Sequence, residues 1–398
     1  MARRVYVTGT NGKTTTTTMI AAIAAAAGEV DARVTTLGTF VGGEKIASAP
    51  TLEAFQLLLD EAARRGARCV AVEAASQALA EGFAHRFPPD VGVFTNLTRD
   101  HLDYHGSFEH YLASKAQLFV NLRAGGVAVL NACDPSSALL AELTPPGVER
   151  RAYATRQVTP ACAALVDGAV GVGAMRVNVS REGTRVRLLP GPIQKKLGTE
   201  IQLRVIGDVY ADDALAAAVA CDALGFDGGA IKLGLESFAG VPGRFQIVRE
   251  APLVVVDYAH TPDALARTLD TARLLARQSA GRVTCVFGCG GDRDPGKRGP
   301  MGALAAELSD VVIVTTDNPR AEDPARIADA IVAGAAAAPR ARAKVTRVAD
   351  RAEAIAQAIR SAAEADVVII AGKGHEAMQI IGDVEHPFDD AAVASAAR

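Results

Sequence analysis

A glycine-rich loop near the start of the sequence carries the residue types that bind nucleotide phosphates. The loop follows the apolar run 5–7 and leads into a segment of helical composition. Glycines let backbone N–H groups close around phosphate, the helix N-terminus adds its dipole, a lysine neutralises phosphate oxygens, and a threonine hydroxyl can hold magnesium. A glycine turn without ligand is the alternative, because Val7 stands where the full phosphate-loop pattern has its first glycine. We predict a phosphate site made of Gly9, Thr10, Asn11, Gly12, Lys13 and Thr14.

Further candidate ligands follow two other apolar runs. Glu73 ends the run 69–72, so its carboxylate should emerge at the carboxyl edge of a sheet, beside the phosphate loop. The run 91–95 leads into the segment 96–106, which holds two aspartates and two histidines and suits a magnesium–phosphate site better than a core. Lys115 follows on a predicted helix, where a lysine by itself would be assigned to a solvated face.

Alternating strand-like and helix-like runs position these groups and predict a mostly parallel sheet covered by helices. Between about 151 and 205 the pattern changes to short runs in which valine and arginine alternate, which predicts antiparallel hairpins appended to that sheet. The alanine-rich segment 212–224 is predicted to be a helix. The predicted strands span 4–7, 68–73, 91–95 and 126–131. One predicted helix begins at Lys13 and another covers 108–119.

The Gly-Val-Pro-Gly cluster at 240–243 is a hinge candidate, because Pro and Gly interrupt regular structure. Beyond it the alternation of strands and helices restarts. We therefore predict an α/β protein with a P-loop ATPase-type central domain at 1–239, which has a parallel sheet plus appended β-hairpins, and a Rossmann-like C-terminal domain at 240–398. The strands predicted for the second domain are 253–257, 282–287, 311–315, 345–348 and 366–371.

Composition excludes several classes of protein. The chain has 398 residues, a formal net charge of −3 and 49% hydrophobic residues, so it offers no general attraction for nucleic acid or an anionic membrane. No window approaches the roughly 18 to 20 apolar residues that span a bilayer. The six cysteines include no CxxC pair, and Cys285 and Cys289 are better explained by a strand that enters a glycine turn than by metal binding. We expect reduced thiols and a cytoplasmic location.

Six motifs, spread in order over essentially the whole chain, closely resemble the Mur ligase family, and within it the MurE branch, the UDP-N-acetylmuramyl-tripeptide synthetases. They are 9–14 (GTNGKT), 95–106 (TNLTRDHLDYHG) with Tyr111 and Lys115, 257–263 (DYAHTPD), 290–294 (GGDRD), 317–320 (DNPR) and 372–376 (GKGHE).

This resemblance implies ATP and Mg²⁺, with two metal sites. In the family's mechanism an acceptor carboxylate attacks the γ-phosphate of ATP, an acyl phosphate forms, and an amine displaces phosphate. On that pattern Thr14 and Glu73 hold one Mg²⁺, His101 helps to hold a second, and Lys115 matches a lysine that is carbamylated into a metal ligand. The resemblance also assigns Asn96, Asp257 and His260 to the nucleotide, and it implies that Arg244 approaches the nucleotide when the domains close.

The amino-acid end of the family's pattern is intact in this sequence. Arg320 can bind a carboxylate bidentately and Glu376 can bind an ammonium, which together match the far end of meso-diaminopimelate. The alternative for Arg320 is an arginine that braces a turn. The predicted substrate-binding residues are Arg293, Asp317, Asn318, Arg320, Gly372 and Glu376.

The acceptor end departs from the family. The phosphate loop begins within ten residues of Met1, so we expect the family's N-terminal uridine-nucleotide domain to be absent, and the segment 207–213 departs from the family's pattern near the adenine. Losing hydroxyls and an arginine while gaining a carboxylate disfavours the usual polyanionic acceptor and predicts a non-standard one. The changed acceptor positions are Ser48, Ala49, Ala75, Gln77, Glu81 and Phe83.

Three alternatives to a ligase with a new acceptor are open. The chain could be a shortened form of an authentic MurE, although shortening alone would not explain the substitutions. Folylpolyglutamate synthetases also do without the uridine-nucleotide domain, but the motifs at 317–320 and 372–376 argue against them. A pseudoenzyme that binds nucleotide to regulate a partner is opposed by the complete set of phosphate and metal residues. The expected partners are small molecules, and the oligomeric state is not predicted.

Overall fold

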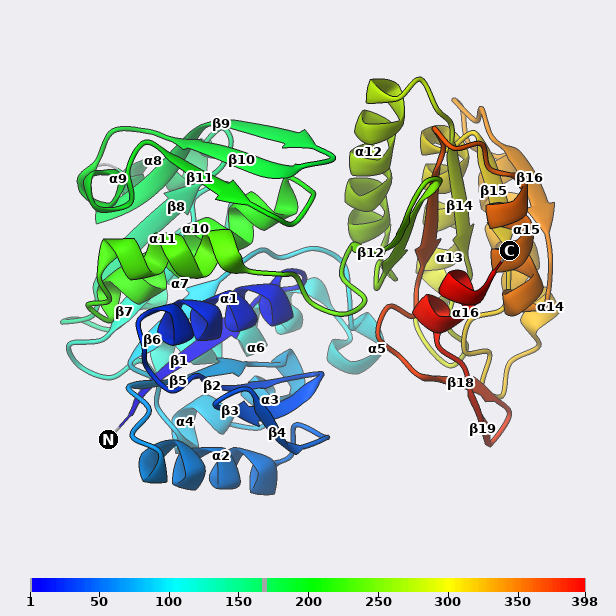
Figure 1. The fold of residues 1–398 in the computed structure, drawn as a ribbon. Coiled ribbons are helices and arrows are strands. Elements are labelled where there is room, and N and C mark those ends of the chain that lie inside the picture. The colour runs from blue at the N-terminus through cyan, green and yellow to red at the C-terminus, as the bar shows by residue number, and fades with distance from the viewer. Residues whose placement is uncertain (1, 167–169, 398) are drawn as a thin grey trace. The chain divides into compact units, whose positions relative to one another are not determined.

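The computed structural model describes residues 2–166 and 170–397. Its contacts divide the chain into two compact units. The first unit comprises 1–98, 104–178 and 182–239, and the second comprises 99–103, 179–181 and 240–398 (Figure 1).

The first unit is built on one sheet of eleven strands among the described residues, in the order β11-β10-β9-β8-β7-β6-β1-β5-β2-β3-β4. Strands β2, β5, β1, β6, β7, β8 and β9 pair in parallel. The bounds are β1 (Arg3–Thr8), β2 (Ala32–Thr35), β3 (Gly38–Val41), β4 (Glu44–Ala47), β5 (Cys69–Glu73), β6 (Val91–Phe94), β7 (Val127–Asn131), β8 (Glu149–Ala154), β9 (Val170–Ser180), β10 (Gly183–Leu188) and β11 (Glu200–Leu203).

Helices cover both faces of this sheet, as parallel strands that are apolar on both sides require (Figure 1). Helices α1 (Lys13–Ala26), α10 (Val209–Ala223) and α11 (Gly228–Ser237) pack together on one face. The opposite face carries α2 (Leu52–Arg64), α6 (Phe108–Val120) and α7 (Ser136–Leu143), whose apolar residues share a core with alternate strand residues. Shorter helices are α3 (Ser76–Ala80), α4 (Phe83–Arg86), α5 (Leu102–His105), α8 (Ala163–Val166) and α9 (Pro192–Leu197).

The structure corrects two predictions for the first unit. The segment 151–205 does contain the antiparallel pair β10–β11, but β8 and β9 pair in parallel and continue the main sheet. Valine–arginine alternation marks strands that are half exposed and carries no information about strand direction. The predicted helix 212–224 begins three residues earlier, at Val209, because its first turn is already buried at Tyr210 and Ala211.

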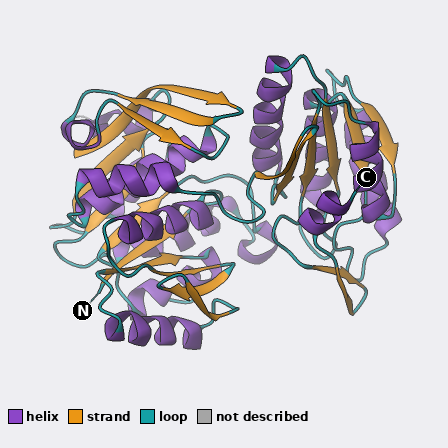
Figure 2. Cartoon of the chain, in the orientation of Figure 1, coloured by secondary structure: helices purple, strands orange, loops and turns teal. Residues whose placement is uncertain are grey.

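The second unit has the predicted α/β form, with a sheet flanked by helices (Figure 2). Its strand order is β12-β13-β17-β14-β15-β16. Five strands are parallel and β12 is an antiparallel edge strand that the sequence analysis did not predict. The bounds are β12 (Gln246–Glu250), β13 (Leu253–Asp257), β14 (Val283–Phe287), β15 (Val311–Val314), β16 (Lys344–Arg347) and β17 (Val367–Ala371).

The helices of the second unit are amphipathic and bury one side each against this sheet. In α12 (Pro262–Gln278), Leu265, Leu269, Ala272 and Leu275 recur at helical spacing and are all buried. The other helices are α13 (Arg298–Leu308), α14 (Pro324–Ala336), α15 (Arg351–Ser361) and α16 (Asp390–Ala396). A separate two-stranded hairpin, β18 (Met378–Ile381) and β19 (Val384–Pro387), follows β17 and was not predicted.

Candidate active site

The phosphate loop connects the end of β1 to the start of α1, as the sequence predicts. Gly9 has a φ of 152°, and a Cβ atom there would lie 1.8 Å from the Thr95 hydroxyl oxygen, so only glycine fits. The Thr10 N–H donates to the Asn96 carbonyl at 2.8 Å and the Asn11 N–H donates to Asn96 Oδ1 at 2.9 Å. Asn96, which follows the neighbouring strand β6, therefore braces the loop.

Two side chains of the predicted phosphate and metal site reach the loop directly. The Lys13 ammonium lies over the loop and donates to the carbonyls of Thr10 at 2.7 Å and Gly9 at 3.2 Å. The Thr14 hydroxyl donates to Glu73 Oε2 at 2.9 Å. A hydroxyl and a carboxylate oxygen at this separation are ligands of the kind that Mg²⁺ prefers, so these residues fit the cation that the sequence predicts there.

Lys115 lies at this site and not on a solvated face. Its side chain is 1% exposed, its ammonium donates to the Gly9 carbonyl at 2.7 Å, and the Nζ atom lies 4.2 Å from the centre of the Tyr111 ring. The Tyr111 hydroxyl lies 3.2 Å from the Thr10 hydroxyl. Lys115 and Tyr111 thus support the phosphate loop from helix α6. Carbamylation of Lys115 stays a prediction.

Two side chains of the predicted acceptor region, Phe83 at a changed position and Ser76 beside one, have definite places in the first unit. Phe83 belongs to an aromatic cluster, with its ring 5.3 Å from that of Tyr6 and 4.9 Å from that of Phe55. Ser76 is buried, and its hydroxyl lies 2.9 Å from His105 Nε2. Phe83 is therefore partly buried against the core, and Ser76 positions the imidazole of His105.

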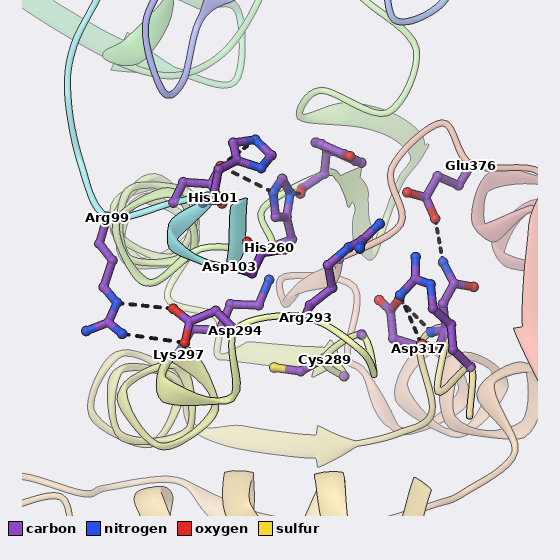
Figure 3. A pocket seen from close by; sticks show the side chains of 17 residues that line it. Arg99, His101, Asp103, His260, Cys289, Arg293, Asp294, Lys297, Asp317 and Glu376 are labelled. Carbon is purple, nitrogen blue, oxygen red and sulfur yellow. Dashed lines mark hydrogen bonds and ion pairs between the residues drawn. The ribbon is translucent and has the colours of Figure 1, made fainter. Parts of the chain in front are cut away.

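A polar pocket lies in the second unit, and all its lining residues belong to that unit (Figure 3). It holds every predicted amino-acid-binding residue and His260, together with groups that the sequence analysis did not assign. The lining residues are Arg99, Asp100, His101, Asp103, Tyr258, His260, Gly288, Cys289, Gly290, Arg293, Asp294, Lys297, Asp317, Asn318, Arg320, Gly372 and Glu376.

One wall of the pocket joins the loop after β15 to the loop after β17. Asn318 Nδ2 donates to Glu376 Oε2 at 2.7 Å (Figure 3). The Asn318 N–H donates to Asp317 Oδ1 at 2.7 Å. Gly372 has a φ of 114°, and a Cβ atom there would lie 2.5 Å from Asp317 Oδ2. Gly372 is thus required by close packing against Asp317.

Two arginines give the pocket positive charge. Arg320 has a φ of 50°, a conformation that non-glycine residues rarely adopt, and its guanidinium donates to the Gly291 carbonyl at 2.8 Å. Arg293 is exposed and follows Asp292, which also has a positive φ, of 51°. Strained backbone at both positions is typical of functional loops.

An ion pair holds these two arginine-bearing loops together, and the sequence analysis missed it. Arg298 is buried and donates from one nitrogen to both carboxylate oxygens of Glu322, at 2.8 and 2.9 Å. The Asp292 N–H donates to the same carboxylate at 2.6 Å. The hydrogen bonds from Arg298 lower the pKa of Glu322, so this carboxylate stays ionised.

The predicted nucleotide residues of the second unit form a connected group. The Arg244 guanidinium lies 4.1 Å from the centre of the Tyr258 ring, and one of its nitrogens is 3.4 Å from His375 Nδ1. Burial and the charge of Arg244 lower the pKa of His375 to about 4, so this imidazole is neutral near pH 7. Burial raises the pKa of Asp257, although backbone N–H groups of Phe245 and Ala259 donate to it.

The remaining predicted residues are the two histidines of the pocket. His101 has a φ of 52°, and its Nε2 lies 3.4 Å from Asp100 Oδ2. His260 Nε2 lies 3.8 Å from the same oxygen. Asp100 is thus shared by both imidazoles. The metal-binding role of His101 stays a prediction.

Lys373 is another residue at this site to which the sequence analysis assigned no role. It is fully buried, and its ammonium contacts Asn318 and Glu376. The signal that could have revealed its role was its position inside the 372–376 motif, immediately after an apolar strand.

Fold and site together define an ATP-dependent ligase, and comparison with known proteins places it. Residues 7–221 match the Mur ligase middle domain, and residues 243–374 match the Mur ligase glutamate ligase domain. The chain belongs to the Mur ligase family, whose enzymes use ATP and Mg²⁺.

Individual relatives are similar over almost the whole chain. The UDP-N-acetylmuramoyl-L-alanyl-D-glutamate–2,6-diaminopimelate ligase of Geobacillus kaustophilus is 40% identical over 98% of this chain and 78% of its own length. A solved structure of a ligase with that same description is 34% identical, with a TM-score of 0.66 over 100% of this chain and 78% of the other. The folylpolyglutamate synthase of Mycobacterium tuberculosis, at 20% identity and a TM-score of 0.70 over 93% of this chain and 88% of the other, shares the fold.

Two features are absent from the described residues. None of the helices in 2–166 and 170–397 is long and apolar enough to cross a membrane. Over the same residues, no group of three or more His, Cys, Asp or Glu side chains is arranged to hold a metal ion. The Thr14–Glu73 pair would therefore have to share a cation with phosphate oxygens of the nucleotide or with water.

Proposed function

We propose that this Mur ligase joins an acceptor carboxylate to an amino group of a diamino acid of the 2,6-diaminopimelate type and forms ADP and phosphate. The pocket of the second unit carries the proposal, because it offers charges of both signs. Arg320 and Arg293 supply positive charge for a carboxylate, and Glu376 and Asp317 supply negative charge for an ammonium. Such a pocket suits an amino acid whose far end is zwitterionic. The same substrate class is named in the 40% identical relative.

The phosphate loop supports the ATP half of the reaction. The acceptor carboxylate attacks the γ-phosphorus and ADP leaves, which gives an acyl phosphate; the amine then attacks the acyl carbon and phosphate leaves. Lys13 and the loop N–H groups would bind the phosphates, and the Thr14–Glu73 pair would hold Mg²⁺, which neutralises developing charge. We also propose that His101 helps to bind a second Mg²⁺ and that Lys115 is carbamylated into a metal ligand, as the family's pattern implies.

In this proposal each of the two units binds a different substrate. Residues 1–239 would bind ATP through the phosphate loop and Asn96, and residues 240–398 would bind the amino acid. Asp257, His260 and Arg244 would contribute contacts to the nucleotide. The partners are then small molecules alone. Because all six cysteines are free of disulfides, we also propose a cytoplasmic location.

The acceptor is proposed to differ from that of the relatives. Phe83 packs its ring against Tyr6 and Phe55, and Ala75 carries no polar group, so these positions supply little that could bind a phosphorylated sugar. The rival proposal is the relatives' own acceptor, bound with the help of a further domain.

One assay tests these proposals together. Phosphate release from ATP should require both an acceptor acid and 2,6-diaminopimelate, and mass spectrometry should find one new amide bond per ADP. Acceptors should include the muramyl dipeptide nucleotide and simpler acyl-glutamates. If the muramyl nucleotide is the one acceptor that supports turnover with 2,6-diaminopimelate, the proposal of a different acceptor is contradicted. If no acceptor supports amine-dependent turnover, a regulatory, nucleotide-binding role is favoured.

A further inference from the structure

We propose that Lys373 is a positioning residue of the amino-acid pocket, which acts through Asn318 and Glu376 and does not touch the substrate. The proposal rests on the proposed function, since it assigns a role within the same pocket. It concerns a buried cation directly behind the wall that would bind the substrate's far ammonium.

Lys373 satisfies all three hydrogens of its ammonium inside the protein. The side chain is 0% exposed. Its Nζ atom lies 2.5 Å from the Met378 carbonyl oxygen, 3.2 Å from Asn318 Oδ1 and 3.4 Å from Glu376 Oε2. A buried ammonium is costly unless every hydrogen finds an acceptor, so these three contacts are what make this lysine tolerable.

The contact with Lys373 fixes which way the Asn318 amide points. A lysine ammonium only donates, so the amide atom that faces it must be the oxygen. The Ile380 N–H donates to that oxygen as well, at 3.0 Å. The amide nitrogen is then turned toward Glu376 Oε2, at 2.7 Å. Without the ammonium only the Ile380 N–H would hold the amide oxygen on this side, so the orientation of the amide would be less firmly fixed.

The same contacts orient Glu376. Lys373 and Asn318 both donate to Oε2, which leaves Oε1 available to a ligand in the pocket that Glu376 lines (Figure 3). The carboxylate is therefore held in one orientation before substrate arrives. Holding it in advance lowers the ordering cost of binding, which should appear in affinity for the amino acid.

Strand β18 connects Lys373 to the other end of the pocket. Ile380 receives the Arg320 N–H on its carbonyl at 3.1 Å, and the Gly382 N–H donates to the Arg320 carbonyl at 2.8 Å. The Met378 carbonyl on the same strand receives the Lys373 ammonium. Lys373 thus supports one side of the pocket, and the backbone of β18 supports Arg320 on the other.

The test is a comparison of Michaelis constants in the full chain. Lys373→Met should raise the KM for 2,6-diaminopimelate by at least 10-fold, while the KM for ATP changes by less than twofold and kcat falls by less than about fivefold. Lys344→Met is the matched control, because Lys344 is an exposed lysine on β16 of the same unit, and it should change none of these values.

A double-mutant comparison separates positioning from general damage. In an Asn318→Ala background Lys373→Met should raise the KM by clearly less than its 10-fold effect in the unmodified chain, since one of the two groups through which it acts is gone. If Lys373→Met does not fold, as judged by circular dichroism, Lys373→Gln and Asn318→Asp replace it and should each raise the same KM. The positioning role would be overturned if the KM effects of Lys373→Met and Asn318→Ala multiplied in the double variant. It would also be overturned if Lys373→Met lowered kcat and left the KM unchanged. Failure of the unmodified protein to use diaminopimelate would instead overturn the proposed function.

Discussion

Lys13 is the side chain on which the ATP half of the reaction depends most. Its ammonium donates hydrogen bonds to the carbonyls of Gly9 and Thr10, and phosphate oxygens of bound ATP would take the place of these acceptors. Lys13→Met should therefore lower the rate of amine-dependent phosphate release by about 100-fold or more, the usual scale for removing one donor from a developing charge. Lys45→Met, at an exposed lysine of the same unit, should leave the rate unchanged. Normal turnover in Lys13→Met would show that the phosphate loop does not take part in the reaction.

Arg320 sets the preference for a carboxylate at the far end of the amino acid in our proposal. Arg320→Lys keeps the charge but removes the planar pair of donors, so the KM for 2,6-diaminopimelate should rise by about 10- to 100-fold, roughly 1.4–3 kcal/mol. The use of L-lysine, which has no far carboxylate, should change little. Equal losses with both amino acids would show that Arg320 only braces its turn. The measurement is steady-state kinetics with each amino acid at saturating ATP.

At the residue scale, sequence reasoning was most successful where the two partners stand at the ends of neighbouring parallel strands. The closeness of Thr14 to Glu73 followed from two neighbouring strand ends. Partners that meet across separate loops could not be found in the same way. The Arg298–Glu322 pair and the Lys373–Asn318 contact join loops whose approach depends on how the whole unit packs. The sequence alone also could not show that Lys115 is buried.

At the scale of elements, a buried ion pair ties the last helix to the strand that leads into the pocket. Arg351, at the start of α15, donates to both carboxylate oxygens of Asp390 at 2.7 Å and to the carbonyl of Ala371, which ends β17. Both side chains are 0% exposed. Asp390→Ala would leave the guanidinium buried without its counter-ion, so the free energy of unfolding should fall by about 3–5 kcal/mol.

The adjacent residue is a matched control for that change. Asp389 is exposed and caps α16 by accepting from the N–H groups of Ala391 and Ala392. Asp389→Ala should cost only about 1 kcal/mol, the usual value of a helix cap. Chemical denaturation followed by circular dichroism would measure both variants. Equal losses for the two would mean that the buried pair contributes no more than the cap.

Parallel strands were the elements that the sequence revealed best. Runs such as 253–257 and 366–371 are apolar throughout because both faces are buried, and this signal is strong. Strands β4 and β19 are short and largely exposed, so they have no apolar run by which to be recognised. The parallel pairing of β8 with β9 was not predicted, since direction is set by the connection and not by the strand's own residues.

At the scale of the whole molecule, each unit has its own hydrophobic core. One cluster joins the first sheet to α2, α6 and α7, and another joins the second sheet to α15 and α16. A change confined to one core should therefore act first on that unit. In Asp390→Ala, hydrogen exchange should accelerate in peptides from 240–397 and stay unchanged in 2–98. Faster exchange in both would mean that the two cores unfold as one.

The stability of the second unit should also depend on pH through His375. Its pKa is lowered to about 4 in the folded chain, whereas an unfolded histidine titrates near 6.5, so the unfolded state binds more protons between these two values. Stability should therefore be complete above about pH 6.5 and should fall as the pH is lowered toward 4. After a reduction for the partial exposure of the ring, the loss attributable to this group is about 1–2 kcal/mol.

The contribution of His375 can be isolated by difference, because carboxylates also titrate in this range. His375→Gln keeps a group that can accept from Arg244 but cannot gain a proton, so its unfolding free energy should depend less on pH between 4 and 6.5 than that of the unmodified chain. The comparison requires urea denaturation at several pH values. His386→Gln, at an exposed histidine of β19, should leave the pH dependence as it is. Parallel curves for the unmodified chain and His375→Gln would show that the imidazole titrates alike in the folded and unfolded states. Burial beside Arg244 would then have no consequence for the stability of the unit that holds the amino-acid pocket.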